Sequence, residues 1–88
     1  MSTSAVTALA RLLTDAAAAI ELADDEAISS DLAEAMLEDL AAGCSDLPAD
    51  DRATAAQAVH IYALEQRDAG RARVMRTLPG ALGLTDDE

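Results

Sequence analysis

Residues 6–20, with the sequence VTALARLLTDAAAAI, determine the fold class of the chain. Their larger apolar side chains recur every three or four positions, the spacing that places them on one side of an α-helix. The run 16–19 is all alanine, which has the highest helix propensity. The stretch therefore predicts a first helix over residues 4–22. Its buried stripe is expected to contain Val6, Leu9, Leu13, Ala16, Ala17 and Ile20, with Thr7, Arg11, Thr14, Asp15 and Glu21 facing solvent.

The next segment predicts a second helix over residues 25–43. The pattern does not decide whether it begins at Asp25 or at Ser30, since either residue follows a capping side chain. Gly43 is expected to end it in a left-handed conformation. The apolar face is expected to contain Leu32, Met36, Leu37 and Leu40, with Asp31, Glu34, Glu38 and Asp39 around the other side.

A third helix is expected over residues 48–67, with Pro48 as its first residue. One apolar face contains Val59 and Tyr62 together with two alanines. Ile61 and Leu64 point well over a quarter-turn away from that face. A helix that is apolar on two sides is usually buried on two sides. Either this is the central helix of the bundle, which we prefer, or its second face binds another chain.

A short fourth helix is expected over residues 71–78, ending before Pro79 because a residue that precedes proline avoids helical geometry. The tail 79–88 should return Leu82 and Leu84 to the bundle and leave residues 86–88 in solvent. The sequence thus predicts one all-α domain over residues 1–88. Its architecture is a small helical bundle of three main helices plus a short C-terminal fourth helix.

The charge of the chain limits the partners it could accept. The 88 residues contain 17 acidic and 6 basic side chains, for a formal charge of −11. This charge repels phosphate backbones and anionic lipids, so we expect no nucleic-acid or membrane partner. Disorder is not expected, since 51% of the residues are hydrophobic, well above the content of disordered segments. The favoured partner is a basic protein.

Charge is also divided along the chain. Residues 15–51 contain twelve acidic side chains and no basic one. Four of the six arginines lie within ten residues near the C-terminus. The four clustered arginines are Arg67, Arg71, Arg73 and Arg76. We expect the fourth helix, which contains most of them, to dock across the acidic first and second helices and neutralise part of their charge. We prefer this explanation to an anion-binding site.

Residue types that carry chemistry are scarce. Cys44 and His60 are single and fall on separate predicted helices, whereas a cysteine–histidine pair must be adjacent. Zinc sites need several such ligands, and the cluster at 24–26 lacks the spacing of a calcium loop. We therefore expect no enzyme activity, no metal and no cofactor. A single cysteine, and no apolar run long enough for a leader or a membrane span, favour a cytoplasmic protein. The lysine-free composition is typical of a high-GC bacterial gene.

A carrier or small-ligand-binding protein is the alternative. Size, acidity and helix content are similar to those of acyl carrier proteins, which bear a cofactor-linked serine in an Asp-Ser-Leu motif at the start of their second helix. Ser29-Ser30-Asp31-Leu32 resembles that motif, but here the aspartate follows the serine. A ligand cavity would be lined by Met36, Met75, Leu40 and Tyr62.

The preferred hypothesis is a small acidic protein–protein interaction module without catalytic activity. It would act as an immunity protein, an antitoxin or a regulatory subunit does, by forming a homodimer or by binding a basic protein. Electrostatic attraction would speed association with such a partner. The candidate interface residues are Ile61, Leu64, Gln57, Glu34, Glu38 and Asp39.

Overall fold

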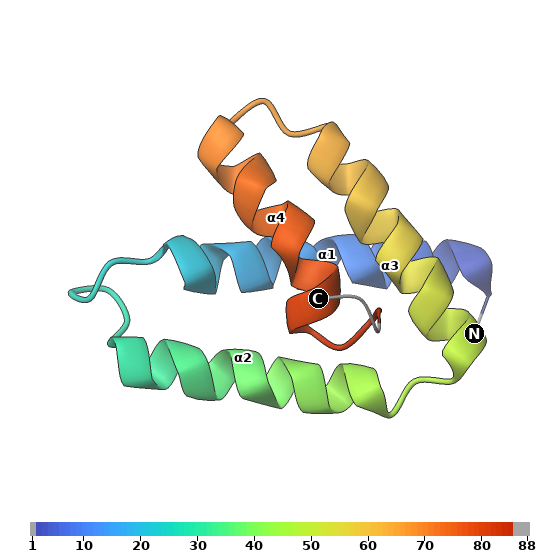
Figure 1. Cartoon of the computed structure of the whole chain (residues 1–88), viewed down its shortest axis with the longest axis horizontal. Helices are drawn as coiled ribbons and strands as arrows, with labels where there is room; N and C mark the ends of the chain where they lie inside the picture. The colour runs from blue at the N-terminus through green and yellow to red at the C-terminus, as the bar shows by residue number, and fades with distance from the viewer. Residues whose placement is uncertain (1, 86–88) are drawn as a thin grey trace.

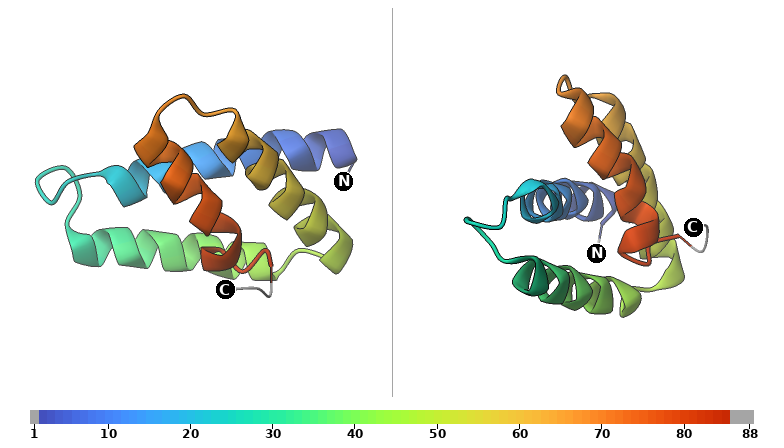
Figure 2. Two further views of the ribbon diagram at one scale, coloured as in Figure 1. Left: turned by 45° about the horizontal axis from the view of Figure 1, so that its top comes forward. Right: turned by 60° about the vertical axis from the view of Figure 1, so that its left-hand side comes forward.

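The computed structural model describes residues 2–85, which form four α-helices and no strand (Figure 1). The helices are α1 (Thr3–Leu22), α2 (Ser30–Ser45), α3 (Ala49–Leu64) and α4 (Ala69–Ala81). α1 and α2 run beside each other as one hairpin, and α3 and α4 form a second hairpin that crosses α1 obliquely (Figures 1 and 2). The predicted all-α bundle is confirmed. The predicted solvated end, residues 86–88, lies outside the described residues.

The start of α2, which the sequence left open, is at Ser30. Ser29 caps this helix, because its hydroxyl oxygen accepts a hydrogen bond from the Leu32 N–H at 3.2 Å. The preceding acidic run forms a separate turn, in which the Asp24 carboxylate accepts from the Ala27 N–H at 2.9 Å. A start at residue 25 is therefore wrong, since that backbone belongs to the turn.

α3 is shorter than predicted at both ends. Pro48 is its N-terminal cap with an extended ψ of 151°, so it is not the first helical residue. At the other end the N–H groups of Glu65 and Gln66 bond to carbonyls three residues back, at 3.1 and 3.3 Å. This tighter pattern closes the last turn and ends the helix at Leu64 instead of residue 67.

The prediction that Gly43 ends α2 is wrong, because the helix continues to Ser45. The Asp46 N–H closes the last turn by bonding to the Gly43 carbonyl at 3.3 Å. This arrangement satisfies a terminal carbonyl without a left-handed residue. Among the described residues the positive φ belongs to Gly83, at 73°. The left-handed glycine thus lies after α4.

α4 extends beyond both predicted ends. It starts earlier because the Asp68 carboxylate caps it, accepting from the Arg71 N–H at 2.8 Å. It also continues two residues past Pro79. The Leu84 N–H bonds to the Pro79 carbonyl at 2.8 Å and Gly83 takes the left-handed conformation, which together form a Schellman ending. This ending places the stop after Pro79, so the predicted end at residue 78 is wrong.

The core lies where α1, α3 and α4 meet. Leu82 and Leu84 return to it after α4, as predicted. Thr14 was expected in solvent, but it is fully buried and its hydroxyl donates to the Ala10 carbonyl at 2.7 Å. Leu9 was expected in the core and is half exposed. The buried core side chains are Val6, Ala10, Ala17, Ala18, Cys44, Ala55, Ala58, Val59, Ala63, Met75, Leu78, Leu82 and Leu84.

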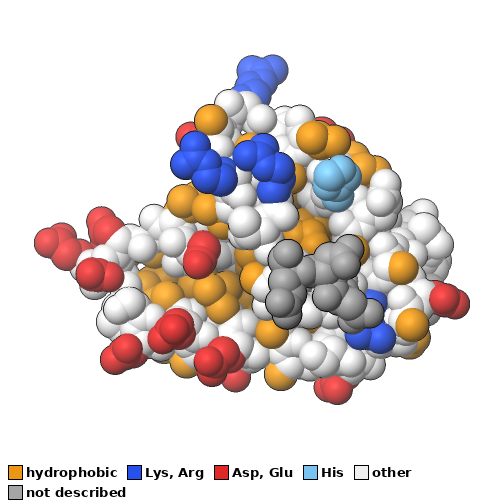
Figure 3. All heavy atoms as spheres, viewed as in Figure 1, with side chains coloured by type: hydrophobic (Ala, Val, Ile, Leu, Met, Phe, Trp, Pro, Cys, Tyr) orange, Lys and Arg blue, Asp and Glu red, His pale blue; other side chains and the backbone are white. Residues whose placement is uncertain are grey.

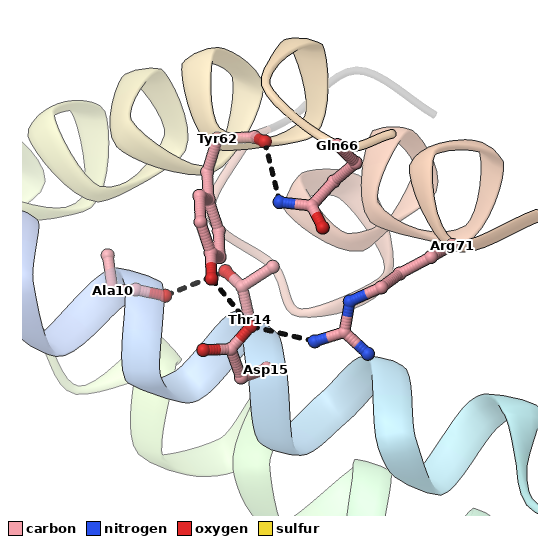
Figure 4. A network of polar contacts seen from close by, with 6 residues as sticks. All are labelled: Ala10, Thr14, Asp15, Tyr62, Gln66 and Arg71. Carbon is pink, nitrogen blue, oxygen red and sulfur yellow. Dashed lines mark hydrogen bonds and ion pairs between the residues drawn. The ribbon is translucent and has the colours of Figure 1, made fainter. Parts of the chain in front are cut away.

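A polar network joins the same three helices (Figure 4). The Tyr62 hydroxyl of α3 donates to the Asp15 carboxylate of α1 at 2.8 Å, and the Arg71 guanidinium of α4 donates to the same oxygen at 2.7 Å. Arg11 lies over the Tyr62 ring, 4.6 Å from its centroid, and pairs with Glu65. Asp15 therefore joins α1 to both helices of the second hairpin.

The arginine cluster behaves differently from our prediction. Arg71 alone of its four members forms an ion pair with another of residues 2–85. α4 packs against α3 and α1 and does not dock across α2, which contains much of the negative charge. Arg67, Arg73 and Arg76 are exposed. Neutralisation of the acidic helices is thus limited to the contact at Asp15.

The second apolar face of α3 is not covered within the described chain. Ile61 is 45% exposed and Leu64 is 68% exposed. α3 does lie against both α1 and α4, but it does so through Val59 and its neighbouring alanines. The preferred intramolecular explanation for Ile61 and Leu64 is therefore wrong.

Candidate functional site

α2 is the least packed helix of the protein. Of its sixteen residues only Cys44 is buried, whereas α1 contributes six buried residues. Its contacts with the rest of the chain are mainly with α1. The apolar face that the sequence predicted for α2 is only partly buried, and Leu32 is half exposed.

The incomplete contact leaves an apolar groove between α1 and α2, about 320 Å³ in volume. We call this the α1–α2 groove. Its apolar walls are formed by Val6, Leu9 and Leu13 from one side and by Leu40 and Leu47 from the other. Ala55 and Leu84 also line it, so the groove lies directly above the core.

Carboxylates lie along the edges of the contact between α1 and α2. Asp39 lines the α1–α2 groove itself. A second hollow of about 430 Å³ lies at the turn between the two helices, where Glu21, Asp25 and Glu34 surround an apolar floor that includes Ile20. Figure 3 shows apolar side chains between carboxylates on this part of the surface. Acidic groups therefore flank apolar surface along the hairpin.

The predicted interface residues lie on two helices, α2 and α3, and do not share one surface. Glu34 lines the hollow at the turn and Asp39 lines the α1–α2 groove, while Glu38 is exposed on the outer side of α2. Gln57 lines a different groove, between α3 and α4. Ile61 and Leu64 lie exposed on α3. The structure thus does not bring the six residues together.

Sequence reasoning missed the main groove residues. Leu9 had been assigned to the core stripe, and Leu40 to the buried face of α2. The periodicity identified both as facing inward, but it contains no information on how closely α2 approaches α1. The hydrophobic pattern would predict the groove only if the distance between α1 and α2 were also known.

Another hollow, with a volume of about 960 Å³, lies between α3 and α4. Three alanines, Pro79, Gly80 and Leu84 line it, together with the polar side chains of Gln57, His60, Arg76, Thr77 and Thr85. It is open to solvent. Its side chains come from the hairpin that contains the arginine cluster.

The chain's reactive residue types are separated in space or engaged in structural contacts. Cys44 is buried and lines the α1–α2 groove, whereas His60 lines the α3–α4 groove. Burial raises the pKa of the Cys44 thiol, which keeps it in the unreactive protonated form. The hydrogen bond to Asp15 raises the pKa of Tyr62. Residues 2–85 contain no cluster of three or more His, Cys, Asp or Glu side chains arranged to hold a metal ion.

The cavity proposed for a carrier protein does not form as predicted. Leu40 lines the α1–α2 groove, but Met75 is fully buried in the core and Tyr62 is hydrogen-bonded to Asp15. Ser29 and Ser30 do open the second helix, as the resemblance to acyl carrier proteins implies, but the Ser29 hydroxyl caps that helix.

The fold and surface define a small helical bundle with one loosely packed, acidic hairpin. No family model, curated protein or solved structure matches the chain. No helix among the described residues has both the length and the apolar character that crossing a membrane requires. The function must therefore be argued from the residues of this chain.

Proposed function

We propose that the protein is a protein–protein interaction module whose α1–α2 groove binds a basic, amphipathic helical segment of a partner. The observation that carries this proposal is the apolar groove beside a loosely packed acidic helix. An amphipathic helix binds such a groove by laying its apolar side chains on the floor. A module of this kind would serve as an immunity protein, an antitoxin or a regulatory subunit, without catalysis.

Charge determines which helical segments fit. Residues 15–51 contain twelve acidic side chains and no basic one, and Asp39 stands in the groove wall. A lysine- or arginine-rich segment would be attracted over a distance of about 10 Å at moderate ionic strength, and an acidic segment would be repelled. The combination of apolar floor and acidic edge therefore favours a basic partner.

A direct test uses a synthetic helical peptide with leucine at every third and fourth position and lysine elsewhere. Fluorescence anisotropy should show saturable binding that weakens as salt is added. The Leu9→Asp variant should lose at least about tenfold in affinity, because it places a charge in the groove wall. Leu12→Asp is the matched control, since Leu12 is 65% exposed on the same helix and does not line the groove.

Two further controls separate groove binding from nonspecific attraction. Asp39→Lys should weaken the peptide more than Glu38→Lys, because Asp39 lines the groove and its neighbour in sequence does not. A peptide of the same composition in scrambled order should bind poorly. Equal binding of the ordered and scrambled peptides, or equal loss in both leucine variants, would contradict the proposal.

A further inference from the structure

α2 presents a second surface, on the side turned away from the α1–α2 groove. Asp31, Glu34 and Glu38 follow one another at spacings of three and four, which places them on one side of the helix. Glu34 is at the edge of this side, where it also lines the hollow at the turn. Ala35 and Ala42 lie on the same side, and all five residues are exposed. We call this the acidic α2 face. Its small side chains leave the carboxylates as its main features.

α4 presents a surface of the opposite charge. Arg73 and Arg76 are three residues apart on its exposed side, with Gly70, Thr77 and Gly80 beside them. We call this the basic α4 face. Neither arginine forms an ion pair with any residue in the described range 2–85. Their positive charge is therefore directed outward, in a chain whose net charge is −11.

Arginine and carboxylate side chains are both exposed on one side of the molecule (Figure 3). In Figure 3 arginine side chains gather over α4 in the upper part of the view, and carboxylates gather over α2 and the adjoining turn in the lower part. The molecule extends over 38 × 28 Å across this view. A standard protein interface buries about 800 Å² on each partner, which a surface of this size can supply.

From this arrangement we infer that a second copy of the chain binds across this side of the molecule as a two-fold symmetric dimer. A two-fold axis brings the acidic α2 face of each copy against the basic α4 face of the other, so both contacts form together. Glycine and alanine beside the charged residues permit the helices to approach closely. This inference goes beyond the proposed function and uses a different side of α2.

The negative charge of both copies opposes the association at long range. Two chains of −11 repel each other, but salt screens this repulsion beyond about 8 Å at physiological ionic strength. Ion pairs formed in direct contact are screened less than the separated charges are. The dimer is therefore expected at moderate salt, with weaker association in very dilute buffer.

Complementary charge reversal tests the inference. The first variant is Arg73→Glu with Arg76→Glu, and the second is Glu34→Arg with Glu38→Arg. Each alone opposes like charges at both contacts, and its dimer dissociation constant should rise by about tenfold or more. An equal mixture of the two restores opposite charges at both contacts. Sedimentation velocity, with circular dichroism to verify folding, should show monomers for each variant and a heterodimer for the mixture.

Net charge cannot produce this result. Starting from −11, two Arg→Glu changes give −15 and two Glu→Arg changes give −7, so the partners in the mixture still repel each other overall. Asp25→Arg with Glu26→Arg is the matched control, because it also gives −7 but lies in the turn before α2. This control should remain dimeric.

The inference is overturned if the wild-type chain is monomeric up to about 1 mM, or if the mixture of variants stays monomeric. It is also overturned if the arginine variant dimerises as the wild type does. The proposed function has a separate outcome. A monomer that binds the leucine–lysine peptide would refute the dimer alone, whereas a dimer that ignores this peptide would refute the groove proposal alone.

Discussion

The two hairpins of the protein differ in how they use their apolar residues. α3 and α4 pack closely on α1, and Val59 and Met75 there are completely buried. α2 has four large apolar side chains of its own, yet Cys44 is its only buried residue. Polar contacts follow the same division, since the network at Asp15 joins α1, α3 and α4 and does not include α2.

Under the proposed function, this difference separates the part of the chain that provides stability from the part that binds a partner. The α1–α3–α4 unit contains most of the buried side chains and both ion pairs found within residues 2–85. α2 leaves apolar surface near the boundary with solvent, where a partner could remove it from water. Burial of apolar surface is the main favourable contribution to protein association. The proposed function therefore assigns partner binding to the least packed helix.

The largest expected effect is the contrast between two methionines. Met75→Ala removes a fully buried side chain of α4 and should cost about 2–5 kcal/mol of unfolding free energy. Met36→Ala removes a partly exposed side chain of α2, gains helix propensity and should cost less than about 1 kcal/mol. Urea unfolding followed by circular dichroism measures both. Equal costs would mean that α2 is as tightly packed as the rest of the bundle.

The fold class could be predicted because its cause is local. Apolar residues at a spacing of three to four, together with alanine runs and capping side chains, determine where helices form. The ends were less predictable, because several residues compete to terminate each helix. Gly43 and Gly83 both follow apolar helical segments, and only the Schellman hydrogen bonds around Gly83 distinguish them.

The candidate site was harder to predict, since it depends on distances between helices. Periodicity indicated that Leu9 and Leu40 face inward, and acidic spacing identified Glu34 and Asp39. Neither pattern indicates that α2 remains partly separated from α1. Likewise, the sequence showed four clustered arginines but not that Arg71 alone would pair with α1. Tertiary packing decides such questions.

Gly83 and Gly43 provide a second test of the difference between the two hairpins, with expected effects of intermediate size. Gly83 has a φ of 73°, where alanine is strained, so Gly83→Ala should destabilise the protein by about 1 kcal/mol or slightly more. Gly43 lies inside α2, and an added Cβ there meets no atom within 4 Å. Gly43→Ala should therefore stabilise the protein by about 0.5–1 kcal/mol. Thermal unfolding would show opposite shifts in melting temperature. A loss of stability in Gly43→Ala would support the left-handed role predicted from sequence.

Tyr62→Phe tests the polar contacts of the tightly packed unit, and its effect should depend on pH. The variant keeps the ring beneath Arg11 but loses the hydrogen bond to Asp15, which should cost about 1 kcal/mol near neutral pH. Asp15 retains its bond to Arg71, so the carboxylate is not left without a partner. The expected cost is therefore that of one hydrogen bond.

The sign of the pH effect follows from the raised pKa of Tyr62. The hydrogen bond to Asp15 is its largest cause, and burial adds to it, so the folded phenol holds its proton above the ordinary value of 10.0. As pH rises, the unfolded chain releases that proton before the folded chain does. The contribution of Tyr62 to stability is therefore complete at pH values below its ordinary pKa, and it is lost as pH rises through the folded pKa. Wild type and Tyr62→Phe should therefore differ most near neutral pH and converge above about pH 10. Cys44, whose pKa burial also raises, titrates in both proteins and cancels from the difference. Urea unfolding across this range measures the convergence, and a difference that grows with pH would show that the Tyr62 hydroxyl does not donate to Asp15.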